Sequence, residues 1–303
     1  MSTMKTLRRS RAALVLATMF AVGASVAASR PAAPSAAAAK HMLFRIRGPH
    51  GATVYLLGSV HLLTPEAGKL PPEVDTAFVH AKLVAFETSL DSLQGRAMEL
   101  AMLARNAPGT TMRSALTPAG AAKADTVLKN YGLSVDQLAP FKPWFATLLM
   151  TQLVIQKAKF QAQYGVDAQI NARAHEANKP TTGLESVDFQ LHLFDSMTPA
   201  EQEEMLVMST PPDSSTENLV KIKDAWLAGN TVMLDSMLNR SMKESPAIFD
   251  KIVVQRNKSW IPRIDSMLQG KDDALVVVGA AHLVGKQGVL EMLKAKGYTI
   301  EQM

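Results

Sequence analysis

Two copies of the pattern Gly-x-x-His stand far apart in the chain, and each directly follows an apolar stretch. The first copy ends in His61 and the second in His282. The segments 54–63 and 275–284 align without a gap, and the Gly, the His and the following Leu are identical in both. Neutral imidazole nitrogens bind divalent metals or transfer protons. The repeat therefore predicts a functional site built from two histidines.

Two glutamates, Glu87 and Glu185, also follow short apolar segments. In open α/β sheets, ligands collect at the carboxyl ends of the strands, so we expect these carboxylates to lie near His61 and His282. Two imidazoles with one or two carboxylates suit Zn, Mn, Co or Fe(II). The structural alternative is a histidine with a packing role, and a glutamate that stabilises the N-terminus of a helix.

Short apolar segments bounded by turn residues predict the strands that position this chemistry, at 43–46, 53–57, 83–86, 181–184, 274–278 and 298–301. Apolar residues at three- and four-residue spacing predict helices over 73–81, 93–106, 118–130, 143–160, 166–178 and 288–296, with several more over 187–269. Strands that are apolar on both faces need helices on both sides. We therefore expect an α/β fold with a mixed central sheet flanked by helices. Two related halves would each contribute a strand followed by Gly-x-x-His, with a mostly helical middle.

Composition excludes several classes of protein. The chain has 303 residues, of which 47% are hydrophobic, and this is enough apolar surface to exclude a disordered chain. The absence of cysteine excludes disulfide scaffolds, thiolate metal sites and cysteine nucleophiles. The net charge is +5, but residues 1–28 contain four basic residues and no acid, so the remainder is close to neutral. Binding to nucleic acid is therefore not expected.

The N-terminal residues have the features of an export signal. Residues 1–28 combine a basic start, an apolar run and small residues at their end, which predicts a signal peptide. Residues 29–40 are rich in Ala and Pro and predict a flexible tether to a folded domain over 41–303. We expect a periplasmic or secreted protein without stable membrane insertion after cleavage. A retained N-terminal anchor is the alternative, because the apolar run reaches the lower length limit of a membrane span.

The chain resembles the TraB/GumN family from about residue 43 to its C-terminus. The motifs that carry the resemblance are VYLLGSVHLL at 54–63, LPPEV at 70–74, the glutamate of LVAFET at 83–88, KPW at 142–144, YGVD at 164–167, GLES at 183–186, RNKSW at 256–260 and VVVGAAHLVGKQGVLEML at 276–293. This family is similar to the TIKI metalloproteases and, more remotely, to the erythromycin esterases and the haem-binding ChaN proteins. Phe44 and Lys142 depart from the family pattern.

The resemblance implies a metal-dependent hydrolase of the peptidase kind, acting on a peptide or small-molecule substrate. Its metal centre would consist of His61, His282 and Glu87 and would hold Mn, Co or Zn. Such a metal activates water, and Glu87 would be either the third ligand or the general base. The remaining candidates are Arg256 and Asn257, which could donate to a developing oxyanion, and Glu185, Gly58, Gly279 and Ser59 in supporting positions.

Two alternative functions remain open on the sequence. A metal-independent ester hydrolase would use His61 or His282 as a general base, as the resemblance to erythromycin esterases implies. A non-catalytic periplasmic protein that binds metal or haem would agree with the resemblance to ChaN. For Arg256 and Asn257 the structural alternative is a surface arginine and an asparagine that pairs locally.

Overall fold

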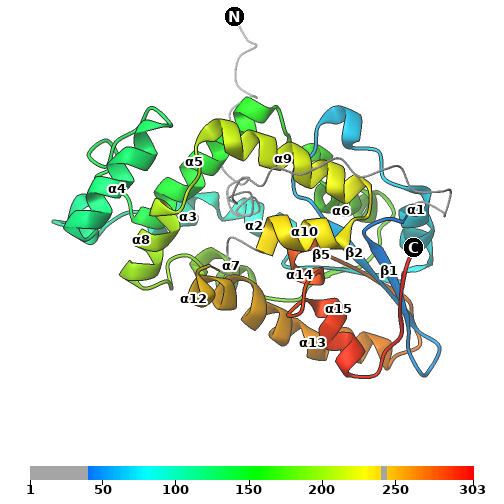
Figure 1. The fold of residues 1–303 in the computed structure, drawn as a ribbon. Helices are drawn as coiled ribbons and strands as arrows, with labels where there is room; N and C mark the ends of the chain where they lie inside the picture. The colour runs from blue at the N-terminus through cyan, green and yellow to red at the C-terminus, as the bar shows by residue number, and fades with distance from the viewer. Residues whose placement is uncertain (1–39, 240–243) are drawn as a thin grey trace, which may run out of the picture.

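The computed structural model describes residues 40–239 and 244–303, so the predicted signal peptide and all but the last residue of the tether lie outside the described residues. Six strands of the described chain form one sheet in the order β4-β3-β5-β2-β1-β6 (Figure 1). The strands are β1 (Leu43–Arg47), β2 (Thr53–Ser59), β3 (Leu83–Phe86), β4 (Thr181–Gly183), β5 (Ala274–Gly279) and β6 (Ile300–Gln302). β4, β3, β5 and β2 are parallel, whereas β1 is antiparallel to both of its neighbours. The prediction of an α/β fold with a mixed central sheet is confirmed.

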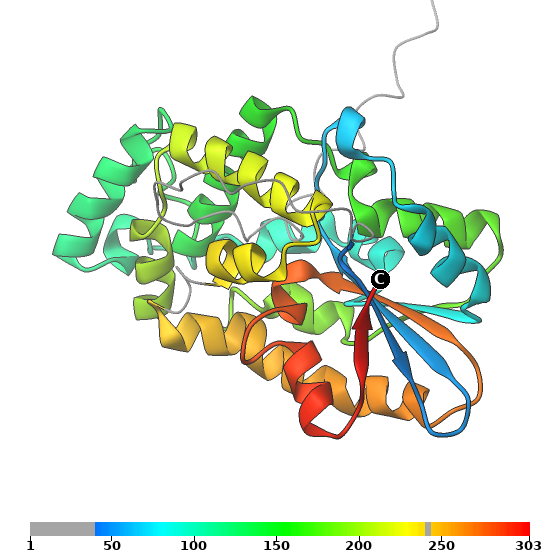
Figure 2. The same cartoon turned by 45° about the vertical axis from the view of Figure 1, so that its right-hand side comes forward.

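The central strands are buried on both faces because they consist almost entirely of apolar residues. Every residue of β5 is buried, and in β2 only the first residue is partly exposed. Helices α13 (Gln255–Leu268) and α15 (Val289–Ala295) cover one face of the sheet, and α1 (Pro72–His80) and α6 (Val166–Glu176) cover the other (Figure 2). The sheet and these four helices share one hydrophobic core.

The middle of the chain forms a second, helical region at the end of the molecule away from the sheet (Figure 1). Its helices and the remaining short ones are α2 (Leu90–Gly95), α3 (Ala97–Leu103), α4 (Pro118–Lys129), α5 (Pro143–Ala158), α7 (Val187–His192), α8 (Pro199–Val207), α9 (Pro212–Leu227), α10 (Thr231–Leu234), α12 (Pro246–Phe249) and α14 (Ala280–Leu283). Single-turn 3-10 or π segments are η2 (Pro65–Ala67), η3 (Arg113–Ala115), η4 (Ala162–Tyr164), η5 (Asp235–Asn239) and η6 (Asp250–Val254). Within the described residues, no helix has the length and apolar content needed to cross a membrane.

Proline and glycine explain where the helices differ from the sequence-based prediction. The helix predicted over 93–106 is divided into α2 and α3, because Gly95 ends the first and the Arg96 side chain bonds to Glu99 at the start of the second. The region 187–269 is divided at prolines, which occupy the first turn of α8, α9 and α12. Proline has no N–H to donate and is favoured in the first turn of a helix, although α13 also contains Pro262 in its interior.

The two strands of the internal repeat are neighbours. β2 and β5 pair in parallel, which brings both Gly-x-x-His segments to the same edge of the sheet. Gly58 pairs with Val278 and Ser59 with Gly279, so the structural register differs by one residue from the sequence alignment. The chain enters α14 directly after β5, and α14 buries His282, whereas the chain after β2 leaves His61 partly exposed. The two histidines therefore have different surroundings.

Candidate active site

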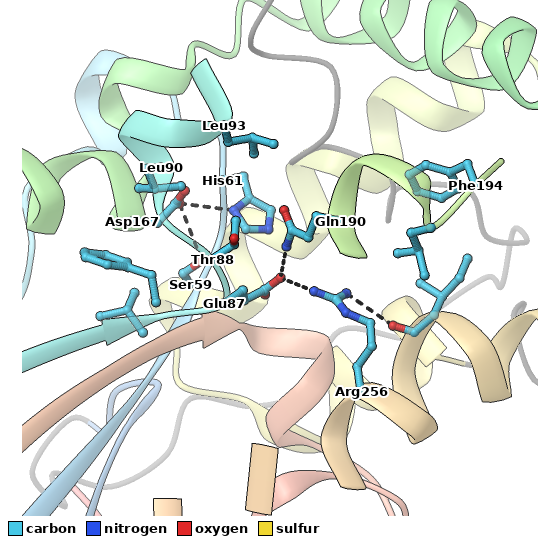
Figure 3. Close-up of a pocket in the computed structure, with 14 residues that line it drawn as sticks. Ser59, His61, Glu87, Thr88, Leu90, Leu93, Asp167, Gln190, Phe194 and Arg256 are labelled. Carbon is cyan, nitrogen blue, oxygen red and sulfur yellow. Dashed lines mark hydrogen bonds and ion pairs between the residues drawn. The ribbon is translucent and has the colours of Figure 1, made fainter. Parts of the chain in front are cut away.

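The candidate site lies at the carboxyl edge of the four parallel strands. Glu87 follows β3 directly, and Glu185 lies two residues after β4. Gly279 ends β5, and His61 lies two residues after β2. The order of these strands therefore places the residues that the sequence singled out along one edge, where Figure 3 shows His61, Glu87 and Arg256 around a common cavity.

His61 is oriented by an aspartate from α6. Its Nδ1 lies 3.2 Å from a carboxylate oxygen of Asp167, which also accepts a hydrogen bond of 3.5 Å from the Ser59 hydroxyl. A glycine at position 165 makes this approach possible, because a Cβ there would lie only 2.2 Å from the carbonyl oxygen of His61. The neighbouring N–H of Val166 donates to the carbonyl of Val60. These backbone contacts fix the first turn of α6 against the end of β2.

The charge of Asp167 changes the acidity of His61. Burial by itself lowers the pKa of His61, but the adjacent Asp167 carboxylate opposes this effect and raises the pKa to about 9. The imidazole of His61 is consequently protonated at neutral pH. Its Nε2 is the nitrogen left to face the cavity, since Nδ1 faces Asp167.

Glu87 accepts hydrogen bonds at both carboxylate oxygens. The N–H of Gly279 donates to Oε1 across 2.7 Å, and Oε2 accepts from Nη2 of Arg256 at 2.6 Å and from Nε2 of Gln190 at 3.3 Å. Burial raises the pKa of Glu87, but Arg256, His282 and His61 together hold it well below its usual range. Glu87 is therefore ionised in the folded protein.

Arg256 forms the centre of a buried charge network. Its side chain is only 3% exposed and pairs with both Glu87 and Glu185. Glu185 also accepts a hydrogen bond of 3.0 Å from the indole of Trp260. Burial lowers the pKa of Arg256, whereas the two carboxylates raise it above its ordinary value, so the guanidinium stays charged. Two buried carboxylates around one guanidinium satisfy the condition that buried charges be paired.

Each N–H of the Arg256 guanidinium has an acceptor within the protein. Nε donates to Glu185, Nη1 to the carbonyl of Ile252 and to Nε2 of His282, and Nη2 to Glu87 and Glu185. A guanidinium has five N–H groups, so none of them is left for a substrate.

His282 is held by two hydrogen bonds. Nη1 of Arg256 lies 3.1 Å from Nε2 of the ring, and Nδ1 lies 2.7 Å from Oδ1 of Asn257. Because Arg256 has only donors, Nε2 accepts and Nδ1 carries the proton that it donates to Asn257. Burial and the Arg256 cation lower the pKa of His282 to about 3, so the ring is neutral.

Two cavities meet at Ser59, His61 and Glu87. The first also has Thr88, Gln190 and Arg256 among its lining residues, with Leu90 and Leu93 of α2 opposite. The second is mainly apolar, with Leu62, Phe160, Leu219, Ile222 and Leu238 in its wall. His61 and Glu87 therefore stand between a cavity with polar groups and a mainly apolar one, a combination that is typical of sites for small ligands.

Comparison with known proteins identifies the family. The model of the TraB/PrgY/gumN family matches residues 42–302, almost the whole described chain. The chain belongs to the TraB/PrgY/gumN family. The resemblance noted in the sequence is thereby confirmed.

Two curated relatives match part of the chain. The chain is 23% identical over 168 residues to the uncharacterized protein YbaP of Escherichia coli (strain K12), and equally to that of Shigella flexneri. The match covers 55% of this chain and 62% of each YbaP protein, so it spans less than two thirds of the relatives' length.

The positions of the donor atoms test whether His61, Glu87 and His282 could bind one metal ion, as the TraB/PrgY/gumN resemblance implies. His61 Nε2 and Glu87 Oε1 lie 3.6 and 3.1 Å from the point where a Cβ on Gly279 would stand, so both face one small space. His282 Nε2, 4.0 Å from Glu87 Oε1, instead accepts from Arg256. Over residues 40–239 and 244–303, no three His, Asp or Glu side chains are grouped so that they could hold a metal ion. As they lie, the three residues do not fit a three-ligand centre, and the metal stays a prediction.

The structure brings most of the sequence-predicted site residues of this TraB/PrgY/gumN protein together. Glu87, Glu185, Arg256 and His282 belong to one connected set of ion pairs and hydrogen bonds. His61 pairs with Asp167 instead and lines the same cavity as Glu87 and Arg256. The distribution of the five predicted residues over five segments of the chain shows that the fold assembles the site.

The remaining candidates, Asn257, Ser59, Gly58 and Gly279, differ in how they contribute to the site. Asn257 is fully buried, bonds to His282 and to the carbonyl of Gln287, and lines neither cavity. Ser59 lines both cavities, whereas a Cβ on Gly58 would press against the side chain of Met42 at 3.1 Å. Gly279 is needed for the space that His61 and Glu87 face.

Sequence reasoning did not assign roles to Asp167, Thr88 and Gln190, which line the first cavity. Asp167 is the last residue of the YGVD motif, two positions after the glycine that lets α6 approach His61. Thr88 follows Glu87 in the chain and could have been noticed there. Gln190 lies on the short helix α7, four residues after the GLES motif, and no pattern in the sequence points to it.

Proposed function

We propose that this protein is a hydrolase that activates water with His61 as general base, oriented by Asp167. The observation that carries the proposal is the pairing of the His61 Nδ1 with the buried Asp167 carboxylate while Nε2 faces the cavity. In catalytic triads a carboxylate orients the histidine through Nδ1 in the same way, while Nε2 acts as the general base. Of the functions considered from the sequence, this is the metal-independent one.

The reaction follows from these positions. In its neutral form His61 removes a proton through Nε2 from a water molecule, whose oxygen adds to the carbonyl carbon of the substrate. Asp167 stabilises the imidazolium that forms, and Glu87, which faces the same space, accepts a hydrogen bond from the O–H that stays on the attacking oxygen. The imidazolium then gives its proton to the leaving oxygen or nitrogen, so that an acid and an alcohol or amine are released.

The second cavity supports a proposal for the substrate class. Its wall is formed mainly by Leu62, Phe160, Leu219 and Ile222, which favour an aliphatic or aromatic group next to the scissile bond. We therefore propose esters or amides with an apolar acyl group, which include peptides with an apolar side chain. Burial of that group would supply binding free energy of about 25 cal/mol per Å².

The metal-dependent peptidase expected from the family resemblance is the competing proposal. It is supported by the shared space that His61 and Glu87 face, since imidazole and carboxylate are suitable donors. It requires His282 to exchange its bond to Arg256 for a bond to the metal. Bound metal would supply Lewis acid chemistry at the carbonyl. The non-catalytic carrier of metal or haem has no such supporting contact.

The testing experiment measures hydrolysis by the purified chain. The substrates are p-nitrophenyl esters from acetate to octanoate and internally quenched peptides with apolar residues, each with and without prior dialysis against a chelator. We expect hydrolysis that survives dialysis and falls by at least about 100-fold in His61→Ala, the lower range of general base catalysis. His80→Ala is the matched control, because His80 is exposed on α1.

The outcomes separate the proposals. Turnover in His61→Ala equal to the native chain would refute the general base role. Activity lost on dialysis and restored by Mn, Co or Zn would favour the peptidase that depends on metal. Binding of haem with no turnover of any substrate would favour the carrier.

Export is the other part of the proposal and rests on the sequence of residues 1–28 alone. We propose a periplasmic or secreted location, with no stable membrane insertion after cleavage of the signal. Fractionation of cells that express the full chain, with mass spectrometry of the mature N-terminus, tests this. Intact chain in the membrane fraction would instead indicate a retained anchor.

A further inference from the structure

Thr88 has a buried hydroxyl without a hydrogen-bond partner in the protein. The residue is 2% exposed, follows Glu87 directly, and lines the first cavity. Figure 3 shows it beside His61 and Glu87. Buried hydroxyls are almost always bonded, because an unpaired one costs free energy. A hydroxyl that stays unpaired at the edge of a reaction site is therefore suited to pair with a bound molecule.

Most of the other polar groups of this cavity are already bonded within the protein or cannot donate. Glu87 and Asp167 are acceptors when ionised, and Ser59 donates to Asp167. Arg256 uses all five N–H groups within the protein, and Gln190 directs one of its two amide N–H groups to Glu87. Thr88 is thus the hydroxyl donor available next to the space that His61 and Glu87 face.

A carbonyl undergoing attack by water needs such a donor. Negative charge develops on its oxygen in the transition state, and a positioned N–H or O–H stabilises that charge. The carboxylates of Glu87 and Asp167 would repel it, so the oxygen must point toward a donor. The sequence suggested Arg256 or Asn257 for this role, but Arg256 has no N–H to spare and Asn257 does not line the cavity.

We propose that the Thr88 hydroxyl donates a hydrogen bond to the carbonyl oxygen of the substrate in the first cavity. This inference rests on the proposed hydrolase function and adds the group that binds the oxyanion. It also gives the substrate a direction, with the carbonyl oxygen toward Thr88 and the apolar group in the second cavity.

Thr88→Val tests the proposal, because valine has the shape of threonine without the hydroxyl. We expect kcat/KM to fall by about 100- to 1,000-fold, the effect of removing one such donor, and binding of the carbonyl compound to weaken as well. Thr88→Ser keeps the hydroxyl and should retain most of the activity. The melting temperature of Thr88→Val should not fall, since the hydroxyl has no partner in the protein to lose.

Thr147 provides a matched control. It is also 2% exposed, its hydroxyl also lacks a hydrogen-bond partner, and it lies on α5 away from both cavities. Thr147→Val should leave kcat/KM unchanged. A loss confined to Thr88→Val and rescued in Thr88→Ser would support the proposal, whereas equal kcat/KM in Thr88→Val and the native chain would overturn it.

A binding measurement separates this inference from the hydrolase function. The same esters and peptides are tested by thermal shift on the native chain, Thr88→Val and Thr147→Val. Compounds that bind without being hydrolysed would refute the hydrolase function, and loss of their shift in Thr88→Val alone would still support a carbonyl contact. A shift preserved in Thr88→Val, or no binding of any compound, would overturn the inference.

Discussion

Arg256 donates from Nη1 to Nε2 of His282 across 3.1 Å, and this contact fixes the state of the second histidine of the repeat. The imidazole is neutral, with its proton on Nδ1 toward Asn257. His61, the first histidine, instead pairs with a carboxylate and faces the cavity. The same Gly-x-x-His pattern therefore supplies one histidine that holds the charge network and one that is available for chemistry.

Replacing Asn257 with Ala should destabilise the fold. The Nδ1–H of His282 would lose its acceptor in a fully buried position, which costs about 1–3 kcal/mol. Denaturant unfolding of Asn257→Ala and of Lys258→Ala, an exposed neighbour on α13, measures the difference. Equal unfolding free energies in the two variants would show that His282 does not need this bond.

Arg256→Lys should be strongly destabilising although it keeps the charge. Lysine cannot reproduce the paired contacts that Arg256 makes with Glu185, and one of the two buried carboxylates would lose its partner. Breaking a buried ion pair costs about 3–5 kcal/mol, measurable by urea unfolding. Arg263→Lys on the exposed side of α13 is the comparison, and a similar loss there would point to a general effect of the helix.

Hydrolysis should increase with pH up to about 9. Only the neutral form of His61 accepts a proton, and the carboxylate of Asp167 raises the pKa of His61 to about 9 despite the opposing effect of burial. Asp167→Asn should shift the inflection of the profile to lower pH and reduce the maximal rate, because the imidazolium loses its partner. A profile that is flat between pH 6 and 9 would contradict this role of His61.

The same pair predicts how stability depends on pH. Since the pKa of His61 is raised on folding above its ordinary value of 6.5, its proton stabilises the folded state. This contribution is fully present below pH 6.5 and is lost as the pH rises through about 9. Urea unfolding across this range should show the decline in the native chain and a smaller decline in Asp167→Asn. If the unfolding free energy declines equally with pH in the native chain and in Asp167→Asn, groups other than His61 cause the decline.

Metal removal should leave the activity of the purified chain intact. Arg256 occupies Nε2 of His282, so we expect no stoichiometric metal in protein purified without chelators or a histidine tag. Elemental analysis of the native chain, His61→Ala and His282→Ala measures this. One Mn, Co or Zn per chain that is lost in both variants would establish the centre of two histidines that the family resemblance implies.

The apolar cavity should set the preferred acyl length. The larger side chain of Leu219→Trp would fill part of the second cavity. Hydrolysis of the octanoyl ester should therefore fall about tenfold more than hydrolysis of the acetyl ester, a ratio within the range by which apolar pockets discriminate between substrates. Val220→Trp, at a neighbouring position of α9 that is 40% exposed, should change neither rate. If Leu219→Trp hydrolyses the octanoyl and acetyl esters in the same ratio as the native chain, the acyl group binds outside the second cavity.

The sequence by itself determined the sheet and the edge where the chemistry lies. Apolar runs ending in Gly-x-x-His or Glu are local patterns, and strands that are buried on both faces must pack between helices. Thus β2, β3 and β5 were predicted to within two residues, and Glu87 and His61 were expected at their carboxyl ends. The repeat also indicated that two related halves would share one sheet, whereas the parallel pairing of β2 with β5 was seen only in the structure.

Only the tertiary structure decided which side chains are paired. Asp167 lies 108 positions from Ser59 in the chain and Arg256 lies 169 positions from Glu87, and no local pattern specifies contacts of that range. Hydrogen-bond saturation depends on all neighbours at once, so the sequence could not reveal that Arg256 has no free N–H while the hydroxyl of Thr88 has no partner. The identical histidine motifs acquire different protonation states for the same reason, since the charge nearest each ring is fixed by packing.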